Sequence, residues 1–280
     1  MKNPYIPFAM TLDEVVIETD DKNIKTFVSS FQCERDECEF QYLPGQFAML
    51  SVLGVGEAAF GIASSPTQPG ILDFTINKIG KVTTELHNLQ AGDVVWIRGP
   101  FGNYYPLDEM QGKDVVIVGG GYAFTTLRSL LYYMLNERNR DRYGQITVVY
   151  GARTPGLLLY KDELLDFCSR PDLDFKITVD KADNGWDGYV GVVPQILEQI
   201  NPASLEAYAI ICGPPMMIKY TLPVVDKLGF SPDRVVLSLE RKMKCAIGMC
   251  GRCNIGGKYV CKDGPIFTLQ QIQEIGEEFI

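Results

Sequence analysis

Hydrophobic and polar positions change their spacing partway along the chain. In roughly the first hundred residues, short apolar runs alternate with turn-forming residues such as Pro44 and Gly45. These runs predict strands at residues 15–17, 25–28, 47–50 and 72–76. Closely spaced strands without long helices between them indicate a small antiparallel β-barrel. The turn residues at 99–102 mark its end.

From residue 114 onward, the apolar positions alternate between buried-strand and helical spacing. Residues 115–118 are wholly apolar, and after three glycines the apolar residues recur at helical spacing over residues 127–135. A further strand at 146–150 completes the order of a parallel βαβ unit. More strands are predicted at 175–179, 208–212 and 235–237, with helices at 161–168, 193–200 and 216–228. The middle of the chain is therefore predicted to be an open parallel α/β sheet.

Charge and composition narrow the function. The chain has 26 Lys and Arg against 35 Asp and Glu, and its net charge of −9 repels nucleic acid and an anionic membrane surface. The single histidine, His87, excludes a serine-type triad and histidine-rich metal sites. Chemistry must then come from bound cofactors, and no catalytic side chain is predicted. Since no apolar run is long enough for membrane insertion, we expect a cytoplasmic protein.

Four of the eight cysteines lie close together near the C-terminus. Cys245, Cys250 and Cys253 are followed by Cys261, which is the spacing of a plant-type ferredoxin. Glycines between them allow the backbone to bend sharply and to point N–H groups at sulfur. The pattern predicts a [2Fe-2S] cluster held by these four thiolates.

A structural zinc site is the alternative, because zinc also takes four thiolates. Paired C-x2-C knuckles are typical of zinc, and only one is present. Cys33 and Cys38 repeat the x4 spacing in an acidic stretch without further partners, and we interpret them as incidental thiols. Three apolar residues near the cluster cysteines are candidate partner contacts or local packing: Met243, Met249 and Ile255.

A family resemblance is carried mainly by two segments, residues 240–253 (ERKMKCAIGMCGRC) and residues 260–267 (VCKDGPIF). Three shorter segments support it: residues 44–47 (PGQF), 99–102 (GPFG) and 212–217 (CGPPMM). Over nearly its whole length the chain resembles the ferredoxin-NADP reductase superfamily. Within it, the chain is most similar to the iron-sulfur electron-transfer subunits of dihydroorotate dehydrogenase, sulfhydrogenase and anaerobic sulfite reductase.

The resemblance implies three parts. These are a flavin-binding antiparallel β-barrel at residues 1–107, an NAD(P)-binding α/β domain at 108–232 and a small [2Fe-2S] module at 233–280. It implies FAD, the cluster and NAD(P) as cofactors. The implied partner is a catalytic redox subunit of a hetero-oligomer, of the hydrogenase, sulfite reductase, disulfide reductase or dihydroorotate dehydrogenase type. Reduced nicotinamide would pass hydride to the flavin, and single electrons would continue through the cluster.

Two segments are assigned to the flavin by the resemblance. Their residues are Phe60, Gly61, Ile62, Ala63 and Ser64, and then Asn77, Lys78, Gly80, Lys81, Val82 and Thr83. The second segment also has a physical basis, because a glycine and hydroxyl residues opening a helix leave N–H groups for a phosphate. Ordinary helix caps share that pattern. The first segment departs from the family, whose arginine and serine are replaced by Ala58 and Gly61. We expect Lys78, Lys81 or Arg98 to supply the missing charge.

The nicotinamide is assigned to residues that follow three strands. They are Gly120, Gly121, Tyr122, Arg153, Cys212, Gly213, Pro214 and Met216. The first loop departs from the family, since Ala123 and Thr126 replace its glycine and proline. Tyr122 either stacks on a ring or packs between domains, and Arg153 either meets a phosphate or is an ordinary exposed arginine. Cys212 either lies beside the nicotinamide or is a small buried side chain.

Two other interpretations remain open from the sequence. The altered nicotinamide loop favours a flavin and [2Fe-2S] electron conduit with a degenerate nicotinamide site. The four cysteines also allow a zinc-clipped assembly subunit without enzymatic activity.

Overall fold

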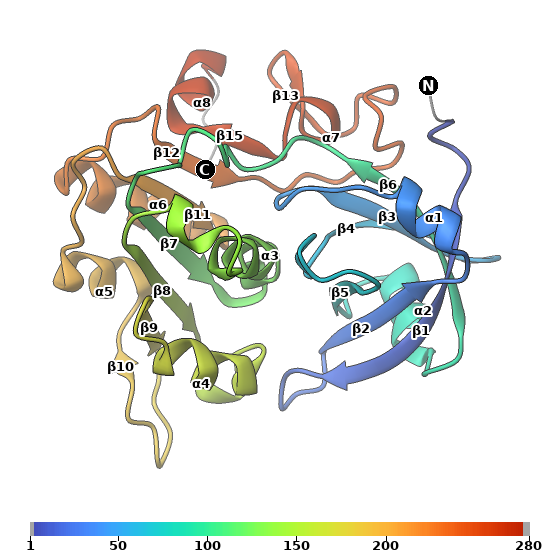
Figure 1. Cartoon of the computed structure of the whole chain (residues 1–280), viewed down its shortest axis with the longest axis horizontal. Helices are drawn as coiled ribbons and strands as arrows, with labels where there is room; N and C mark the ends of the chain where they lie inside the picture. The colour runs from blue at the N-terminus through green and yellow to red at the C-terminus, as the bar shows by residue number, and fades with distance from the viewer. Residues whose placement is uncertain (1–2, 277–280) are drawn as a thin grey trace.

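The computed structural model describes residues 3–276. It shows two sheets side by side, with the C-terminal segment lying across the ends of both (Figure 1). No helix of the described residues is long and apolar enough to cross a membrane.

The first sheet has six antiparallel strands in the order β4-β3-β6-β1-β2-β5. Their bounds are β1 (Phe8–Ile17), β2 (Ile24–Phe31), β3 (Phe47–Val52), β4 (Gly56–Gly61), β5 (Leu72–Asn77) and β6 (Val94–Phe101). Two short helices accompany them, α1 (Glu34–Glu39) and α2 (Lys81–Asn88). Alternate side chains such as Phe8, Met10 and Leu12 are buried on the inner face of the curled sheet. The antiparallel architecture predicted for this part is confirmed.

The second sheet has seven strands in the order β10-β9-β8-β7-β11-β12-β15. Its strands are β7 (Val115–Gly120), β8 (Ile146–Ala152), β9 (Asp174–Val179), β10 (Tyr189–Val190), β11 (Tyr208–Cys212), β12 (Val235–Ser238) and β15 (Ile266–Thr268). The accompanying helices are α3 (Phe124–Leu135), α4 (Lys161–Ser169), α5 (Val193–Ile200) and α6 (Pro215–Lys227). The predicted parallel α/β domain is confirmed. Because β7 pairs with β8 on one side and β11 on the other, the strand order reverses there, where such sheets bind ligands.

The edge of this sheet differs from the prediction of an all-parallel sheet. Strand β15 comes from the cysteine-rich end of the chain and pairs with β12 in the antiparallel direction. A three-residue strand has too short a pattern to be recognised in the sequence. The remaining elements of this end are β13 (Asn254–Ile255), β14 (Lys258–Tyr259), α7 (Val260–Asp263) and α8 (Leu269–Ile275). The cysteine segment is thus anchored directly to the α/β sheet.

Asn103 ties the cysteine segment to the first sheet as well. Its amide nitrogen donates to the carbonyl oxygens of Asp263 and Ile266 at 3.1 and 2.7 Å, and its side-chain oxygen accepts from the Ile266 N–H at 2.9 Å. All three polar positions of one half-buried side chain therefore hold the same short segment. This contact fixes the cysteines relative to both sheets.

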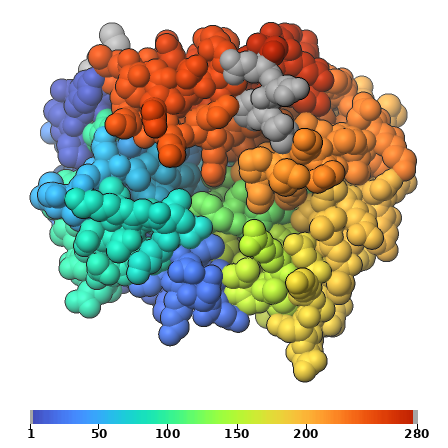
Figure 2. Space-filling model, turned by 180° about the vertical axis from the view of Figure 1, so that it is seen from behind, coloured from blue at the N-terminus to red at the C-terminus, as the bar shows by residue number. Residues whose placement is uncertain are grey.

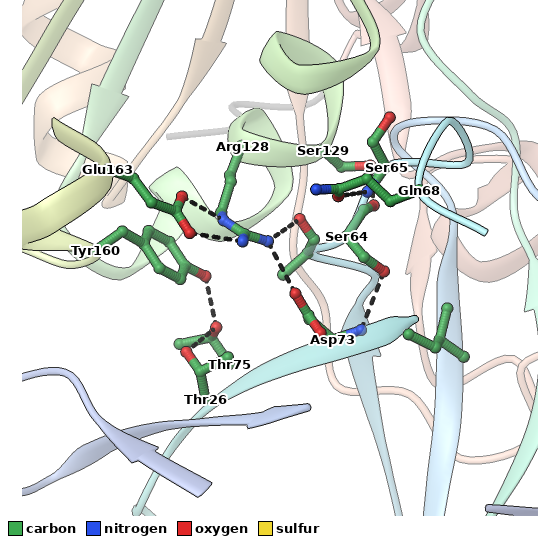
Figure 3. Close-up of polar contacts among 12 residues, drawn as sticks. Thr26, Ser64, Ser65, Gln68, Asp73, Thr75, Arg128, Ser129, Tyr160 and Glu163 are labelled. Atoms are coloured by element: carbon green, nitrogen blue, oxygen red, sulfur yellow. Dashed lines mark hydrogen bonds and ion pairs between the residues drawn. The ribbon is translucent and has the colours of Figure 1, made fainter. Parts of the chain in front are cut away.

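A buried polar network joins the two sheets (Figure 3). Arg128 of α3 forks onto Glu163 of α4 through two 2.7 Å hydrogen bonds, and its third nitrogen donates to Asp73 of β5 and to the carbonyl oxygen of Ala63. Tyr160 packs under the guanidinium, 4.7 Å from ring centre to Cζ. Burial raises the pKa of the Asp73 carboxyl, an effect that Arg128 opposes. The guanidinium therefore neutralises carboxylates from both parts of the molecule.

Candidate functional site

A cavity of about 360 Å³ opens at the carboxyl ends of β7, β11 and β12. One wall comes from the loop after β7, with Gly120, Tyr122 and Ala123, and a second from β11 and the start of α6. The second wall consists of Cys212, Gly213, Pro214, Pro215 and Ile218. The cavity lies at the reversal of strand order, the position expected for a nucleotide in an open α/β sheet.

The third wall was not anticipated from the sequence. It consists of Ser238, Leu239, Glu240 and Arg241, which follow β12 and lead into the cysteines. Desolvation raises the pKa of the Glu240 carboxyl. Since Glu240 and Arg241 open the most specific segment of the family resemblance, a signal was present in the sequence. Only the pairing of β12 with β11 shows that they face the cavity.

The sequence-assigned nicotinamide residues divide into two groups. Five of them line the cavity, namely Gly120, Tyr122, Cys212, Gly213 and Pro214. The other three, Gly121, Arg153 and Met216, are not part of its lining; Arg153 and Met216 are exposed. The Tyr122 hydroxyl donates to the Thr75 carbonyl oxygen of β5 at 2.7 Å. Tyr122 therefore both walls the cavity and joins the two sheets.

Cys212 is a protonated thiol at neutral pH. Its side chain is 3 % exposed, and burial raises its pKa to about 12. The sulfur lies 3.5 Å from Oγ1 of Thr126 on α3. The side chain is therefore buried and also lines the cavity, and its place beside the nicotinamide stays a prediction. A neutral thiol can contact a ring there, but it is not a nucleophile.

Gly61 and Thr126 bring the first flavin segment into contact with helix α3. A Cβ atom added at Gly61 would lie 2.3 Å from Cγ2 of Thr126, so the two positions share one space. The two departures from the family, at 61 and at 126, are therefore structurally linked. A threonine on α3 fits only because residue 61 has no side chain.

We expect Gly61→Ser to destabilise the protein by about 1–3 kcal/mol, because the new Cβ overlaps the Thr126 methyl group. The double variant Gly61→Ser/Thr126→Ser should recover most of that loss, since Thr126→Ser deletes Cγ2 and keeps the hydroxyl. Urea unfolding of the wild type, the two single variants and the double variant measures the coupling free energy between the two positions. Additive effects would contradict the steric link.

The rest of the first flavin segment is built into the core. Phe60, Ile62, Ala63 and Ser64 are all buried. Ser64 accepts a hydrogen bond from the Asp73 N–H, and its carbonyl oxygen accepts one from Ser129 of α3 at 2.6 Å. The segment is therefore held from both sheets, and Gly61, at the end of β4, is its accessible part.

The predicted diphosphate segment opens helix α2. Gly80 precedes the helix, and its N–H and that of Ile79 both donate to the Thr83 hydroxyl. A Cβ at Gly80 would meet no atom within 4 Å, and Lys78 and Lys81 are exposed beside it. An open helix N-terminus flanked by two cations fits a diphosphate. Asn77 ends β5, and Val82 is half-buried.

Arg98, the third candidate for the missing charge, is already engaged. Its guanidinium forks onto Glu57 at 2.8 and 3.0 Å and donates to the Pro4 carbonyl oxygen at 2.7 Å. Of the three candidates, the exposed cations are therefore Lys78 and Lys81.

The four predicted ligand cysteines form two pairs in a loop. N–H groups of Met249 and Cys250 donate to the Cys245 sulfur at 3.3 and 3.4 Å, and the Cys261 N–H donates to the Cys253 sulfur at 3.5 Å. Burial opposes the Cys245 thiolate, but N–H groups of Ile247 and Cys250 outweigh it and lower its pKa to about 6.

Pairing suits a two-iron cluster, because each iron binds two bridging sulfides and two thiolates. Among the described residues, no group of three or more His, Cys, Asp or Glu side chains is arranged to hold a single metal ion. Gly248, at φ 75°, brings its N–H to the Cys261 sulfur at 3.2 Å. N–H groups aimed at sulfur are the contacts that tune a cluster.

The apolar residues near these cysteines differ in exposure. Met249 is 74 % exposed, whereas Met243 is half-buried against the core. Ile255 is 1 % exposed, so its interpretation as a partner contact is wrong. Its side chain points inward from the short β13–β14 hairpin and packs the segment onto the α/β sheet.

Together, an antiparallel flavin-type sheet, a nucleotide-type α/β sheet and a loop with four cysteines at ferredoxin spacing define a redox module of the ferredoxin reductase class. Three family descriptions match in that order. Residues 14–105 match "Oxidoreductase FAD-binding domain", residues 117–222 "Oxidoreductase NAD-binding domain" and residues 240–273 "Iron-sulfur cluster binding domain of dihydroorotate dehydrogenase B".

Whole-chain relatives agree. The chain is 36% identical to Sulfhydrogenase 1 subunit gamma of Pyrococcus furiosus, over 95% of this chain and 92% of that protein. It is also 36% identical to the "Probable dihydroorotate dehydrogenase B (NAD(+)), electron transfer subunit" of Thermococcus kodakarensis, over 83% and 87%. The chain belongs to this family of FAD- and NAD-binding iron-sulfur electron-transfer subunits.

Solved structures show the same fold. A chain from the study "Insights into flavin-based electron bifurcation via the NADH-dependent reduced ferredoxin-NADP oxidoreductase structure" matches with a TM-score of 0.72 and 25% identity, over 94% of this chain and 91% of that one. A ferredoxin NADP+ reductase from Neisseria gonorrhoeae with bound FAD and NADP matches with a TM-score of 0.66 and 21% identity, over 80% and 92%. The latter likeness concerns the fold alone.

Proposed function

We propose that this chain takes electrons from NADH or NADPH into a flavin and a [2Fe-2S] cluster and passes them to a catalytic redox subunit in a cytoplasmic hetero-oligomer. One observation carries the proposal: the cavity is lined by the α/β sheet and by the start of the cysteine segment, and one of its lining residues is hydrogen-bonded to the first sheet. Tyr122 ties it to the first sheet, Cys212 belongs to the α/β sheet, and Glu240 begins the cysteine segment. A nicotinamide bound in this cavity would lie close to both the flavin part and the cluster part, so no segment of the chain would have to move between them.

The residues present suit the assigned groups. Gly80 and the two neighbouring lysines offer an anion site for the FAD diphosphate, with open space at the Gly80 position. Bound flavin accepts electron pairs and releases single electrons, and a [2Fe-2S] cluster carries one electron at a time. The chain itself holds and orients these groups. Because the pKa of the Cys212 thiol is raised, this side chain stays neutral and adds no negative charge to the cavity.

The relatives are subunits of a sulfhydrogenase and of a dihydroorotate dehydrogenase, which supports a catalytic partner of a hydrogenase, dihydroorotate dehydrogenase or similar redox type. The four ligand cysteines require a reducing compartment, which supports the cytoplasm. The iron-sulfur match at residues 240–273 favours iron over the zinc-clipped alternative.

Anaerobic mixing of the purified protein with NADH and with NADPH tests the proposal. At least one should bleach the flavin absorbance and then produce the electron paramagnetic resonance signal of a reduced cluster. We expect Ala123→Trp, which fills the cavity, to slow this reduction about 10- to 100-fold while dithionite still reduces both groups. Ala182→Trp on an exposed loop is the matched control.

No bleaching by either nucleotide would replace the proposal with the electron conduit that lacks a nicotinamide site. Equal rates for wild type and Ala123→Trp would show that the cavity is not where the nicotinamide acts.

A further inference from the structure

The charge of the chain is distributed unevenly around the cysteines. Residues 241–262 contain six Lys or Arg and no Asp or Glu, although the whole chain carries −9, so the remainder carries −15. Five of the six cations are defined here as the basic collar. They are Lys242, Lys244, Arg252, Lys258 and Lys262, and all five are exposed. A two-iron cluster with four thiolates carries a charge of about −2, so this segment stays positive when loaded.

The collar residues lie before, between and directly after the four cysteines in the chain. Lys244 and Arg252 each directly precede a ligand cysteine, and the stem of Lys262 covers Gly248, whose added Cβ would lie 2.9 Å from the lysine Cδ. Within this charged rim Cys250 is exposed. In Figure 2 the red-orange atoms of this segment lie along one edge of the molecule, beside the dark-blue N-terminal segment.

The cysteine segment also makes an apolar contact, through Met249. The exposed Met249 sulfur accepts a hydrogen bond from the hydroxyl of Tyr5, which is itself 57 % exposed. Methionine and tyrosine are enriched at the centres of protein interfaces, and charged residues lie at their rims. The segment therefore combines basic residues, an apolar contact and an exposed ligand cysteine, a combination that suits an electron-transfer contact.

We propose that the basic collar is the docking surface for an acidic face of the redox partner. This inference rests on the proposed function and adds the place and charge of the contact. Nucleic acid fits less well, because a long polyanion would extend from the collar onto a surface carrying the remaining −15. A compact acidic protein face meets the collar alone.

The proposed docking surface is tested by whether the rate constant of electron transfer rises or falls with salt. Protein reduced with dithionite, and freed of the excess, is mixed anaerobically with oxidised rubredoxin, a small acidic iron protein. If net charge governs the encounter, two acidic proteins repel, and the second-order rate constant rises with ionic strength. If the collar governs it, the rate constant falls, by about tenfold between about 0.01 and 0.3 M. We expect the fall.

The double variant Lys242→Glu/Lys258→Glu should reverse the slope. Each site is separated by two residues from the nearest cysteine, so iron content and the cluster spectrum should be unchanged. Arg138→Glu/Lys181→Glu changes the net charge equally at exposed sites outside the segment and should keep the wild-type slope.

The outcomes separate the inference from the function on which it rests. A rate that rises with salt in the wild type, or a slope changed equally by both double variants, would overturn the docking surface alone. Tighter binding of a DNA oligonucleotide than of rubredoxin at equal ionic strength would overturn the choice of partner. A fully reduced cluster that reduces no rubredoxin at any ionic strength would overturn the electron-transfer function itself.

Discussion

Cys250→Ser should remove the cluster: iron and labile sulfide should fall to near zero and the signal of the reduced cluster should disappear. A serine hydroxyl stays protonated where a thiol ionises, so one iron loses half of its protein ligands. Cys250 belongs to a pair with Cys245, whose thiolate is stabilised by surrounding N–H groups. Iron and sulfide analysis with electron paramagnetic resonance measures the effect.

Cys38→Ser is the matched control for this change. Cys38 is also exposed and also follows another cysteine at x4 spacing, but its neighbour Cys33 lies at the start of a separate helix, α1. Its replacement should leave iron, sulfide and spectrum unchanged. Retention of full iron by Cys250→Ser, or equal loss in both variants, would contradict the ligand assignment; stoichiometric zinc would restore the zinc-clipped alternative.

Arg128→Met should lower the free energy of unfolding by about 3–5 kcal/mol. It removes the guanidinium that pairs with two carboxylates and leaves both of them without a cation. Asp73 is 5 % exposed; its Oδ2 accepts from Arg128, and its buried Oδ1 has no hydrogen-bond partner. The variant should also release FAD more readily, since Arg128 holds the Ala63 carbonyl of the flavin segment. Urea unfolding and the fluorescence of released FAD measure the two effects.

Arg170→Met provides the comparison, since Arg170 forms an ion pair of similar geometry with Asp172, whose side chain is 31% exposed. Its loss should cost about 1 kcal/mol or less because water screens the pair. Arg128→Lys should fall between the two, since a lysine keeps the charge but cannot form the fork. A loss for Arg128→Met no greater than that for Arg170→Met would show that the network does not stabilise the contact between the sheets.

Much of the fold follows from local patterns in the sequence. Residues 115–118 and 127–135 predicted β7 and α3 because buried parallel strands are continuously apolar and a helix repeats every 3.6 residues. Strand β4 was missed, since Gly56, Glu57 and Ala58 show neither apolar alternation nor branched side chains. Its pairing with β3 supplies the hydrogen bonds that make it a strand.

The chemistry of the molecule was determined by the sequence to different extents at different sites. Cysteine spacing was sufficient to predict the [2Fe-2S] loop, because a ligand set within one short loop is a local property. The sequence predicted residues of only two of the three walls of the cavity. Its third wall, including Glu240 and Arg241, comes from strand β12, which lies far from β7 in the chain and beside β11 in the sheet.

By itself, the sequence determined the order of the three parts and the types of the main elements, and it predicted the cluster ligands, since each depends on residues close together in the chain. The tertiary structure decided how the parts meet. Arg128 with Asp73, Gly61 with Thr126 and Asn103 with Ile266 are pairs separated by 55 or more residues. Such contacts depend on packing and desolvation, which only the folded chain creates.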